Sequence, residues 1–326
     1  MSSLGSPVRK GGEDVTSRLV SVRREELERE LKTRGASLRE LLARSDLDLW
    51  GSGPVRIGIS GGADSMGLAL LAWANGQQVL GVHVDHGLRS DSNTEGRMIA
   101  DALAPFGIGL LECRVDVEAG GNLEDRARQA RLAILGGAAT AHTMDDQAET
   151  VIANLLRGAG LVGVGAMQPG RRHPILRLRR SETRLLCEAA GVWIFDDPSN
   201  GDPRFVRNRV RAELLPLAAD ILQRDVVPIL ARTAANSQEY AEAISAVLSQ
   251  LPQGLEDLPP VLARHRLNSL ITAGLGLRLN GDHLEQIRQV AIGERPAHQI
   301  VHAITVRRVH DGLVFVDRDG NRLLQL

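Results

Sequence analysis

The sequence contains very few aromatic residues and almost no lysine. Aromatic residues make up 2% of the 326 residues, and Tyr240 is the single tyrosine. Of the 39 basic residues only Lys10 and Lys32 are lysines, and both precede the glycine-rich segment discussed below. A lysine nucleophile in the core is therefore not expected, and few rings are available to stack on a nucleic-acid base. The excess of arginine suits bidentate contacts with phosphate, although a GC-rich genome gives the same bias.

Cysteine is equally scarce. Cys113 and Cys187 are the only two, which excludes a disulfide framework and a CxxC metal or redox pair. No apolar run approaches the roughly 18 residues of a membrane span, and the N-terminus lacks the apolar stretch of a secretory signal. A reducing, cytoplasmic location is expected. The formal net charge of −1 excludes a uniformly basic nucleic-acid binder but leaves room for a local basic face.

The length and the residue pattern predict one large and one smaller domain. Residues 1–48 are expected to be an N-terminal extension, partly disordered and partly helical, because a small polar stretch precedes a charge-rich segment with leucines at helical spacing. Residues 49–220 are expected to form the main domain. Residues 221–326 are expected to form a mostly helical domain that closes with a β-hairpin at residues 310–312.

Strand-like and helix-like segments alternate along the main domain. Short β-branched or apolar runs predict strands, and segments with helical spacing of apolar residues predict helices between them; the strands are expected at 55–59, 79–84 and 108–117 and the helices at 94–107, 122–139 and 145–158. Such alternation favours an α/β fold with a doubly wound parallel sheet. Ligands of these folds bind beyond the carboxyl ends of the strands. Residues 60–65, 85–89 and 142–146 follow predicted strand ends, which favours a single site.

The segment SGGADS, residues 60–65, leaves a predicted strand and enters a predicted helix. Gly61 and Gly62 let the backbone approach an anion, and the positive end of the helix lies at the same point. Ser60 and Ser65 add hydroxyl donors, and Asp64 is a candidate ligand for Mg²⁺ against phosphate. The segment is neither a Walker A loop nor G-x-G-x-x-G. Taken alone, it is equally well an ordinary tight turn.

A second cluster of polar residues lies at the start of the predicted helix over 145–158. It contains His142, Asp145, Asp146 and Glu149. Asp146 and Glu149 are three residues apart and share one helix face. Acidic residues in a first helical turn also serve as caps that complement the helix dipole, so each carboxylate has a structural alternative.

Five segments, taken in order and with their spacing, resemble a known family. They are SGGADS, VDHGLRSDS, NLEDRARQARL, AHTMDDQAETVIANLLRGAG and DDPSNGDPRFVRNRVRAELLP. Together they are similar to the tRNA(Ile)-lysidine synthetases, a family within the PP-loop ATP-pyrophosphatase group. The resemblance covers residues 55–217 and extends more weakly over 225–290. The first motif marks only the wider group, whereas the combination is specific for the family.

The resemblance implies a reaction in two steps. ATP, with Mg²⁺, activates the C2 oxygen of the wobble cytidine in a tRNA(Ile) with anticodon CAU, and pyrophosphate leaves. The ε-amino group of free lysine then attacks C2 and expels AMP. The modified base pairs with A instead of G. Such an enzyme has to align a weakly nucleophilic oxygen with the α-phosphorus and to stabilise the departing pyrophosphate.

The resemblance also implies roles for individual residues. Asp64 would lie near Mg²⁺, and Asp146 and Glu149 would hold the cationic lysine and take its proton. His142 and Asp145 lie beside them as further candidates for the chemistry. The ATP-binding residues are expected to be Ser60, Gly61, Gly62, Ala63, Asp64 and Ser65 for the phosphates, and Asp85 and His86 for the adenosine.

Two further groups are assigned to nucleic acid or phosphate. Arg128 matches the family's helix arginine and is a candidate phosphate contact. Ten arginines and five acidic residues fall within residues 171–211, which favours a tRNA face with salt-sensitive binding. Within it, the residues that match the family motif are Arg204, Arg207, Asn208 and Arg211. An ordinary charged helix surface is the alternative. Short members of the family are often dimers, so a homodimer is a further expectation.

Three alternative functions remain open from the sequence. Another PP-loop enzyme that thiolates tRNA would need reactive cysteines, and Cys113 and Cys187 lie in an apolar strand and a helix. An amidating synthetase would need a glutamine-hydrolysing partner. A protein that binds ATP and tRNA without catalysis would have no use for the carboxylates Asp64, Asp146 and Glu149.

Overall fold

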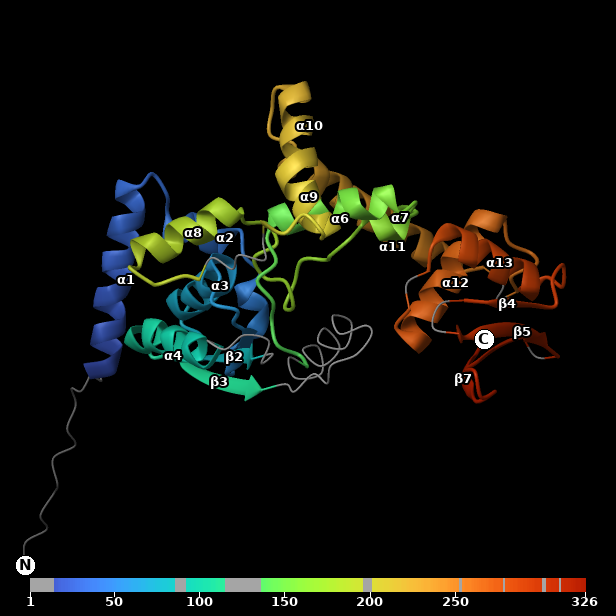
Figure 1. The fold of residues 1–326 in the computed structure, drawn as a ribbon, viewed down its shortest axis with the longest axis horizontal. Coiled ribbons are helices and arrows are strands. Elements are labelled where there is room, and N and C mark those ends of the chain that lie inside the picture. Colours follow the sequence, from blue (N-terminus) through green and yellow to red (C-terminus); the bar gives the residue numbers. More distant parts are fainter. Residues whose placement is uncertain are drawn as a thin grey trace, which may run out of the picture. The chain divides into compact units, whose positions relative to one another are not determined.

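The computed structural model describes residues 15–85, 92–114, 136–195, 201–251, 254–277, 279–300, 303–310 and 312–326 (Figure 1). The chain divides into two compact units. The first comprises residues 1–146 and 169–202, and the second comprises residues 147–168 and 203–326. In the described part of the chain, no helix has the length and apolar character needed to cross a bilayer.

The first unit is built on a parallel sheet in the order β1-β2-β3. The strands are β1 (Val55–Gly58), β2 (Val79–Asp85) and β3 (Gly109–Arg114), and both pairings are parallel. On the other side of β1, Ala139 pairs in parallel with Ile57, and its N–H donates to the Arg56 carbonyl at 2.8 Å. The predicted parallel α/β fold is confirmed. Because parallel neighbours end at the same edge, residues 60–65 and 140–146 leave the sheet side by side.

Helices connect and cover these strands. They are α3 (Ala63–Ala74), α4 (Ser92–Leu103) and α8 (Arg180–Ala189), with the short 3₁₀ turns η1 (Leu47–Trp50) and η2 (Ala104–Phe106). Eleven of the twelve α3 residues are buried, because this helix packs against both β1 and α8. A helix that is apolar on every face is a core helix. At the α3–α8 contact a Cβ on Gly67 would lie 2.9 Å from the Thr183 Cβ, so glycine permits this close approach.

The helices α1 (Val15–Thr33) and α2 (Leu38–Ala43) belong to the core of the first unit. Figure 1 shows one end of α8 lying against α1, and the two helices are in contact. Leu31 and Leu38 are 0% and 2% exposed. Burying a leucine stabilises a fold by about 1.5–3 kcal/mol, so these helices contribute to the stability of the unit. Residues 1–48 were expected to form an extension, and the structure has α1 and α2 within the core of the first unit. Leucine spacing alone does not reveal what an apolar helix face packs against.

Helix α6 (Met144–Leu156) contains the boundary between the two units, which falls after Asp146. The second unit continues with further helices, and Val151 of α6 packs there with Val164, Ala166 and Ala234. These helices are α7 (Leu161–Val164), α9 (Val206–Arg209), the π-helical stretch η4 (Val210–Leu214), α10 (Leu215–Leu222), α11 (Val227–Ser249), α12 (Pro260–Leu275) and α13 (Gly281–Ala291).

The second unit also contains an antiparallel sheet in the order β4-β5-β6-β7. Its strands are β4 (Ala297–Gln299), β5 (Thr305–Val309), β6 (Gly312–Val316) and β7 (Arg322–Gln325). The predicted terminal hairpin is the β5–β6 pair, and β4 and β7 extend it on either side. The fully buried Ile287 and Phe315 lie in the core between α13 and this sheet. The C-terminal region is therefore less purely helical than the sequence indicated.

Candidate active site

The loop from Ser60 to Ser65 is held in a tight, defined shape. The Ser60 N–H donates to the Ser65 Oγ at 3.1 Å, and the Ser65 hydroxyl donates to the Gly62 carbonyl at 2.9 Å. Gly61 has a φ of +78°, and its carbonyl accepts the Phe195 N–H at 2.8 Å. Gly62 is the N-cap of α3, and no side chain caps this helix start. The first N–H groups of α3 therefore form the kind of anion site that a helix N-terminus provides.

Asp64 lies in the first turn of α3 and faces α8. Its Oδ1 accepts the Thr183 hydroxyl at 2.5 Å, and its Oδ2 accepts the Arg180 Nε at 3.3 Å. Burial raises the pKa of the Asp64 carboxyl above its usual value, and the nearby Asp146 carboxylate adds to this increase; the bonds from Thr183 and Arg180 act in the opposite direction. The ionised form of Asp64 is therefore held at an energetic disadvantage, which is common for functional carboxylates.

The described contacts of Asp146 include a structural one and an electrostatic one. Its Oδ2 accepts the Thr143 N–H at 2.8 Å and the Thr143 hydroxyl at 3.0 Å, which caps the start of α6. Its Oδ1 accepts the Arg180 Nη2 at 2.9 Å. The capping interpretation is thus correct for one oxygen only. The other oxygen shares a guanidinium group with Asp64, so Asp64 of the glycine loop and Asp146 at the start of α6 lie close together.

Asp145 has a different environment from that of its neighbour. Its carboxylate accepts the Arg179 Nε and Nη2 at 3.1 and 3.0 Å, and it accepts the Arg180 backbone N–H at 2.8 Å. These hydrogen bonds outweigh burial, the largest single influence, and the pKa of Asp145 is lowered. A carboxylate engaged in this way is suited to fixing the start of α8 rather than to exchanging protons.

Arg180 and Thr183 are the site residues that the sequence analysis missed. Arg180 appeared there only as one of the ten arginines of a possible tRNA face. A usable signal exists, because Arg180 opens a helix and a positive side chain in a first turn opposes the helix dipole. An arginine in that position is expected to have carboxylate partners, which here are Asp64 and Asp146.

His142 belongs to a small cluster at the same edge of the first unit. Its Nδ1 lies 2.9 Å from the Thr140 hydroxyl oxygen and 3.2 Å from the Nδ1 of His173. The Thr140 hydroxyl also lies 2.8 Å from the His173 Nδ1, and the two rings meet edge to face. Burial, with the neighbouring His142 and Arg172, lowers the pKa of His173 to about 4. His173 is therefore neutral at physiological pH.

Glu149 is fully buried and is surrounded by arginine in the second unit. Its Oε2 accepts the Arg207 Nε at 2.8 Å, and Arg211 donates from Nε to Oε1 at 2.6 Å and from Nη2 to Oε2 at 3.1 Å. The side chains of Arg207 and Arg211 remain 42% and 32% exposed. Arg207 and Arg211 were predicted to contact tRNA, and Glu149 was predicted to bind lysine. In the structure Glu149 holds both arginines in place.

The arginine-rich segment 171–211 is less available than its sequence implies. Many of its arginines pair with carboxylates among the described residues, and these include Arg177, Arg179, Arg180, Arg207, Arg209 and Arg211. Arg204 is exposed and Asn208 is half-buried, and Phe205, which follows Arg204 in the chain, is 37% exposed. The local excess of positive charge is therefore partly neutralised within the protein.

Asp85, His86 and Arg128 are the remaining predicted site residues. Asp85 is half-buried at the end of β2, where it is in register with Arg114 of β3. Asp85 was expected to follow the second strand, and it is the last residue of β2. His86 and Arg128 lie outside the described residues.

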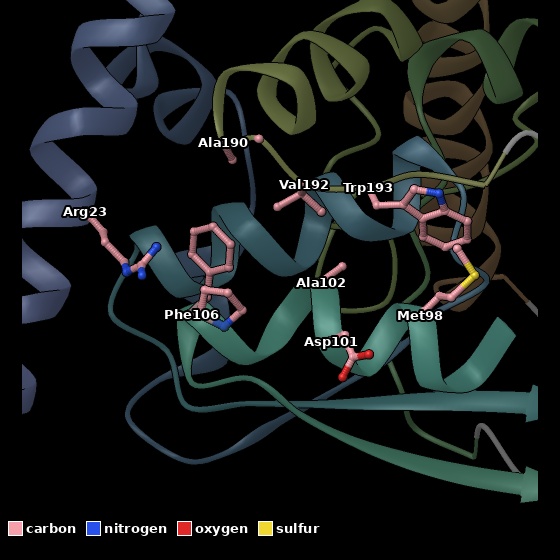
Figure 2. Close-up of a pocket in the computed structure, with 10 residues that line it drawn as sticks. Arg23, Met98, Asp101, Ala102, Phe106, Ala190, Val192 and Trp193 are labelled. Carbon is pink, nitrogen blue, oxygen red and sulfur yellow. The ribbon is translucent and has the colours of Figure 1, made fainter. Parts of the chain in front are cut away.

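A cavity of about 490 Å³ lies elsewhere in the first unit (Figure 2). Figure 2 shows Arg23 of α1 directed toward Phe106, and its Cζ lies 5.8 Å from the ring centroid. None of the predicted site residues lines this cavity. Its lining consists of Arg23, Met98, Asp101, Ala102, Pro105, Phe106, Ala190, Gly191, Val192 and Trp193.

Cys187 is buried on α8 near the loop, and its thiol donates to the Ala63 carbonyl at 3.5 Å. Burial raises the pKa of this thiol to about 12, and Asp64 contributes in the same direction. Since the thiolate is the reactive form, Cys187 is a packing residue. Cys113 is half-buried on β3.

Several known proteins are similar to this chain. A family model described as "PP-loop domain" matches residues 31–218. The tRNA(Ile)-lysidine synthase of Rhodococcus erythropolis is 35% identical over 262 residues, which cover 74% of this chain and 81% of the relative. The tRNA(Ile)-lysidine synthase of Mycobacterium bovis is 37% identical over 295 residues, which cover 82% of this chain and 90% of the relative. The solved structure of the U34-tRNA thiolase NcsA from Methanococcus maripaludis with its [4Fe-4S] cluster is 16% identical, with a TM-score of 0.46 over 69% of this chain and 80% of that chain.

Proposed function

Since the chain belongs to the tRNA(Ile)-lysidine synthase family and contains its PP-loop domain, we propose that it joins free lysine to the wobble cytidine of a CAU-anticodon tRNA(Ile) at the site between Ser60 and Asp146. Members of this family are ATP-dependent ligases that modify tRNA. The observation that carries the assignment to these residues is the single guanidinium of Arg180, which contacts both Asp64 and Asp146. A tRNA substrate is available in the cytoplasm, which is the proposed location.

The first step activates the cytidine. Its C2 oxygen attacks the α-phosphorus of ATP, and the bond to the pyrophosphate breaks. The N-terminal N–H groups of α3 and the Ser60 hydroxyl are suited to stabilise the charge of the departing pyrophosphate. The backbone around Gly61 and Gly62 supports this role, because Gly62 begins α3 without a capping side chain that would compete with a phosphate. Asp85, at the end of β2, is proposed to contact the adenosine.

The residues present fit a magnesium ion. No group of three or more histidine, cysteine or acidic side chains with ligand geometry exists among the described residues. Mg²⁺ commonly uses one or two carboxylates and takes its other ligands from phosphate and water. Asp64 lies in the first turn of α3 and already contacts a cation, Arg180, so it is the carboxylate that would hold the ion. When bound, it would neutralise charge on the phosphates.

The second step requires an amine without its proton. Asp146 is proposed to hold the lysine ammonium through Oδ1 and to accept its proton, after which the nitrogen attacks C2 and the bond to AMP breaks. Glu149, three residues later on α6, is proposed as the second carboxylate for the amine. Arg207 and Arg211 balance its charge in this structure.

The tRNA backbone is proposed to contact Arg204, Arg207, Asn208 and Arg211. Two observations support this. Arg207 and Arg211 keep partly exposed guanidinium groups although Glu149 fixes them. Phe205 exposes an apolar ring next to Arg204, in a chain with few such rings.

The function is tested by incubating the full chain with ATP, Mg²⁺, radiolabelled lysine and a CAU-anticodon tRNA(Ile) transcript. The expected result is label in the tRNA with release of AMP and pyrophosphate, and no label when lysine is offered with a CAU-anticodon methionine tRNA. ATP binding without labelling would instead identify a non-catalytic tRNA-binding protein. A tRNA thiolase is not favoured, because burial leaves Cys187 in its unreactive thiol form.

The Gly61→Ala variant is expected to lose both stability and nucleotide binding. Gly61 has a positive φ, which costs a non-glycine residue about 1–2 kcal/mol. A Cβ would also lie 3.2 Å from the Ile99 Cδ1 and 3.4 Å from the Phe195 Cβ. The loop then shifts from its phosphate-binding shape. Urea unfolding and titration calorimetry with a non-hydrolysable ATP analogue measure the two effects.

Gly76→Ala is the matched control for this change. Gly76 has a similar φ of +81°, and a Cβ at this position would meet nothing within 4 Å. Gly76→Ala should therefore lose only the part of the unfolding free energy that comes from the positive φ, and it should bind the ATP analogue as the unmodified chain does. Equal behaviour of the two variants would remove Gly61 from the phosphate site.

A further inference from the structure

Arg180 joins the two acidic motifs of the first unit through one guanidinium group. Its Nε donates to the Asp64 Oδ2 at 3.3 Å, and its Nη2 donates to the Asp146 Oδ1 at 2.9 Å. The side chains of Arg180, Asp64 and Asp146 are only 27%, 24% and 11% exposed. A planar guanidinium with donors in a fixed fork can contact two carboxylates at once. The two carboxylates therefore share one counter-charge.

The position of this guanidinium is fixed by its surroundings. The Arg180 backbone N–H donates to the Asp145 Oδ2 at 2.8 Å. One turn later on α8, the Thr183 hydroxyl donates to the other oxygen of Asp64. Close packing at Gly67 holds α8 against α3. These contacts hold the start of α8 beside the loop, so we expect a change in the Arg180 contacts to come from its side chain.

The proposed substrates carry charges that act on Arg180 in opposite ways. Nucleotide phosphates at the start of α3 attract the guanidinium, since arginine binds phosphate through the same planar fork. The lysine ammonium, in contrast, requires the Asp146 oxygen that Arg180 occupies. Two cations on one carboxylate oxygen repel each other, so the ammonium and the guanidinium compete for Asp146.

We propose that Arg180 is a positioning residue that couples the nucleotide site to the amine site. It occupies Asp146 while the loop after β1 holds no nucleotide, and it releases this carboxylate when phosphates draw its guanidinium away. Lysine then binds weakly to the free enzyme and more tightly to the enzyme with nucleotide. The inference rests on the proposed function, and in particular on Asp146 as the site of the lysine ammonium.

Equilibrium dialysis of radiolabelled lysine against the full chain tests the coupling, with and without α,β-methylene ATP and Mg²⁺. The nucleotide analogue is expected to tighten lysine binding about tenfold, within the usual range for coupled sites. In Arg180→Met the competitor is absent. This variant is expected to bind lysine without nucleotide about as tightly as the unmodified enzyme does with it, so the nucleotide effect disappears. A merely structural role for Arg180 would weaken lysine binding in both states.

Arg180→Lys gives the second test and does not depend on the folding of Arg180→Met. A lysine ammonium is a single point charge and cannot contact both carboxylates, so the nucleotide effect should fall below half of its original size. Arg34→Ala is the matched control. Arg34 pairs at 3.5 Å with Glu188, which is also on α8 but outside the site, and its removal should leave the coupling intact.

The failure of this inference can be told apart from the failure of the proposed function. If Asp146→Asn leaves lysine affinity unchanged, the amine site is not at Asp146 and the proposed function needs revision. If Asp146→Asn weakens lysine binding while Arg180→Met keeps the full nucleotide effect, Arg180 does not couple the sites. Absence of any nucleotide effect in the unmodified enzyme would also overturn the coupling.

Discussion

Replacement of Asp146 by asparagine is expected to slow lysine transfer strongly while the activation of tRNA by ATP continues. The amide keeps an oxygen for the Thr143 N–H, so the start of α6 remains capped. What it loses is the negative charge on the oxygen that faces Arg180, and with it the group that holds the ammonium and accepts its proton. A positioned acid–base group contributes about 10²–10⁴-fold to a rate, and lysidine formation should fall by this factor.

Two measurements on Asp146→Asn separate the steps. The rate of lysine-dependent labelling of tRNA should fall by this factor, whereas pyrophosphate release from ATP in the presence of tRNA should persist. Asp48→Asn, an exposed carboxylate of the same unit, is the control and should behave as the unmodified enzyme. Labelling at the original rate in Asp146→Asn would show that this residue has no part in the transfer of lysine.

Replacement of Asp64 by asparagine is expected to stop the first step without reducing stability. Burial and the Asp146 charge raise the pKa of Asp64, so its ionised form is less favourable in the folded chain than in the unfolded chain. A neutral amide removes this penalty and can still accept the Thr183 hydroxyl. The negative charge for Mg²⁺ and phosphate is lost, and the loss of one such electrostatic contact lowers kcat about 10²–10³-fold.

Asp64→Asn is expected to change activity and stability in different directions. Pyrophosphate release and lysidine formation should fall together, and the midpoint of thermal unfolding should stay the same or rise. Such a trade between activity and stability is typical of functional carboxylates. A variant that retains pyrophosphate release would exclude Asp64 from the activation step. A lowered unfolding midpoint would instead indicate that Asp64 is structural.

Much of the site could be predicted from local sequence. Gly61 and Gly62 between a strand and a helix indicated a phosphate loop, and the structure has Gly61 at positive φ with α3 starting directly after Gly62. The parallel sheet followed from alternating strand and helix patterns, and it places the loop and the start of α6 at one edge. These features depend on backbone sterics and on the periodicity of apolar side chains, which are local properties of a sequence.

The partners of the charged residues could not be predicted in the same way. Arg180 pairs with Asp64 and Asp146, which are 116 and 34 positions away in the chain. Glu149 pairs with Arg207 and Arg211, 58 and 62 positions away. The sequence assigned these carboxylates and arginines to separate ligands, because composition does not indicate which opposite charges neutralise each other within the protein.

The sequence by itself determined the family, the parallel α/β core and the residues at the strand ends, since each of these is recorded in short segments with fixed spacing. Only the tertiary structure decided that α1 and α2 complete the first core, that Arg180 links the loop to Asp146, and that Glu149 is neutralised by arginine. The physical reason is desolvation. A buried charge must find a counter-charge wherever folding places one, and only the packed chain specifies that position.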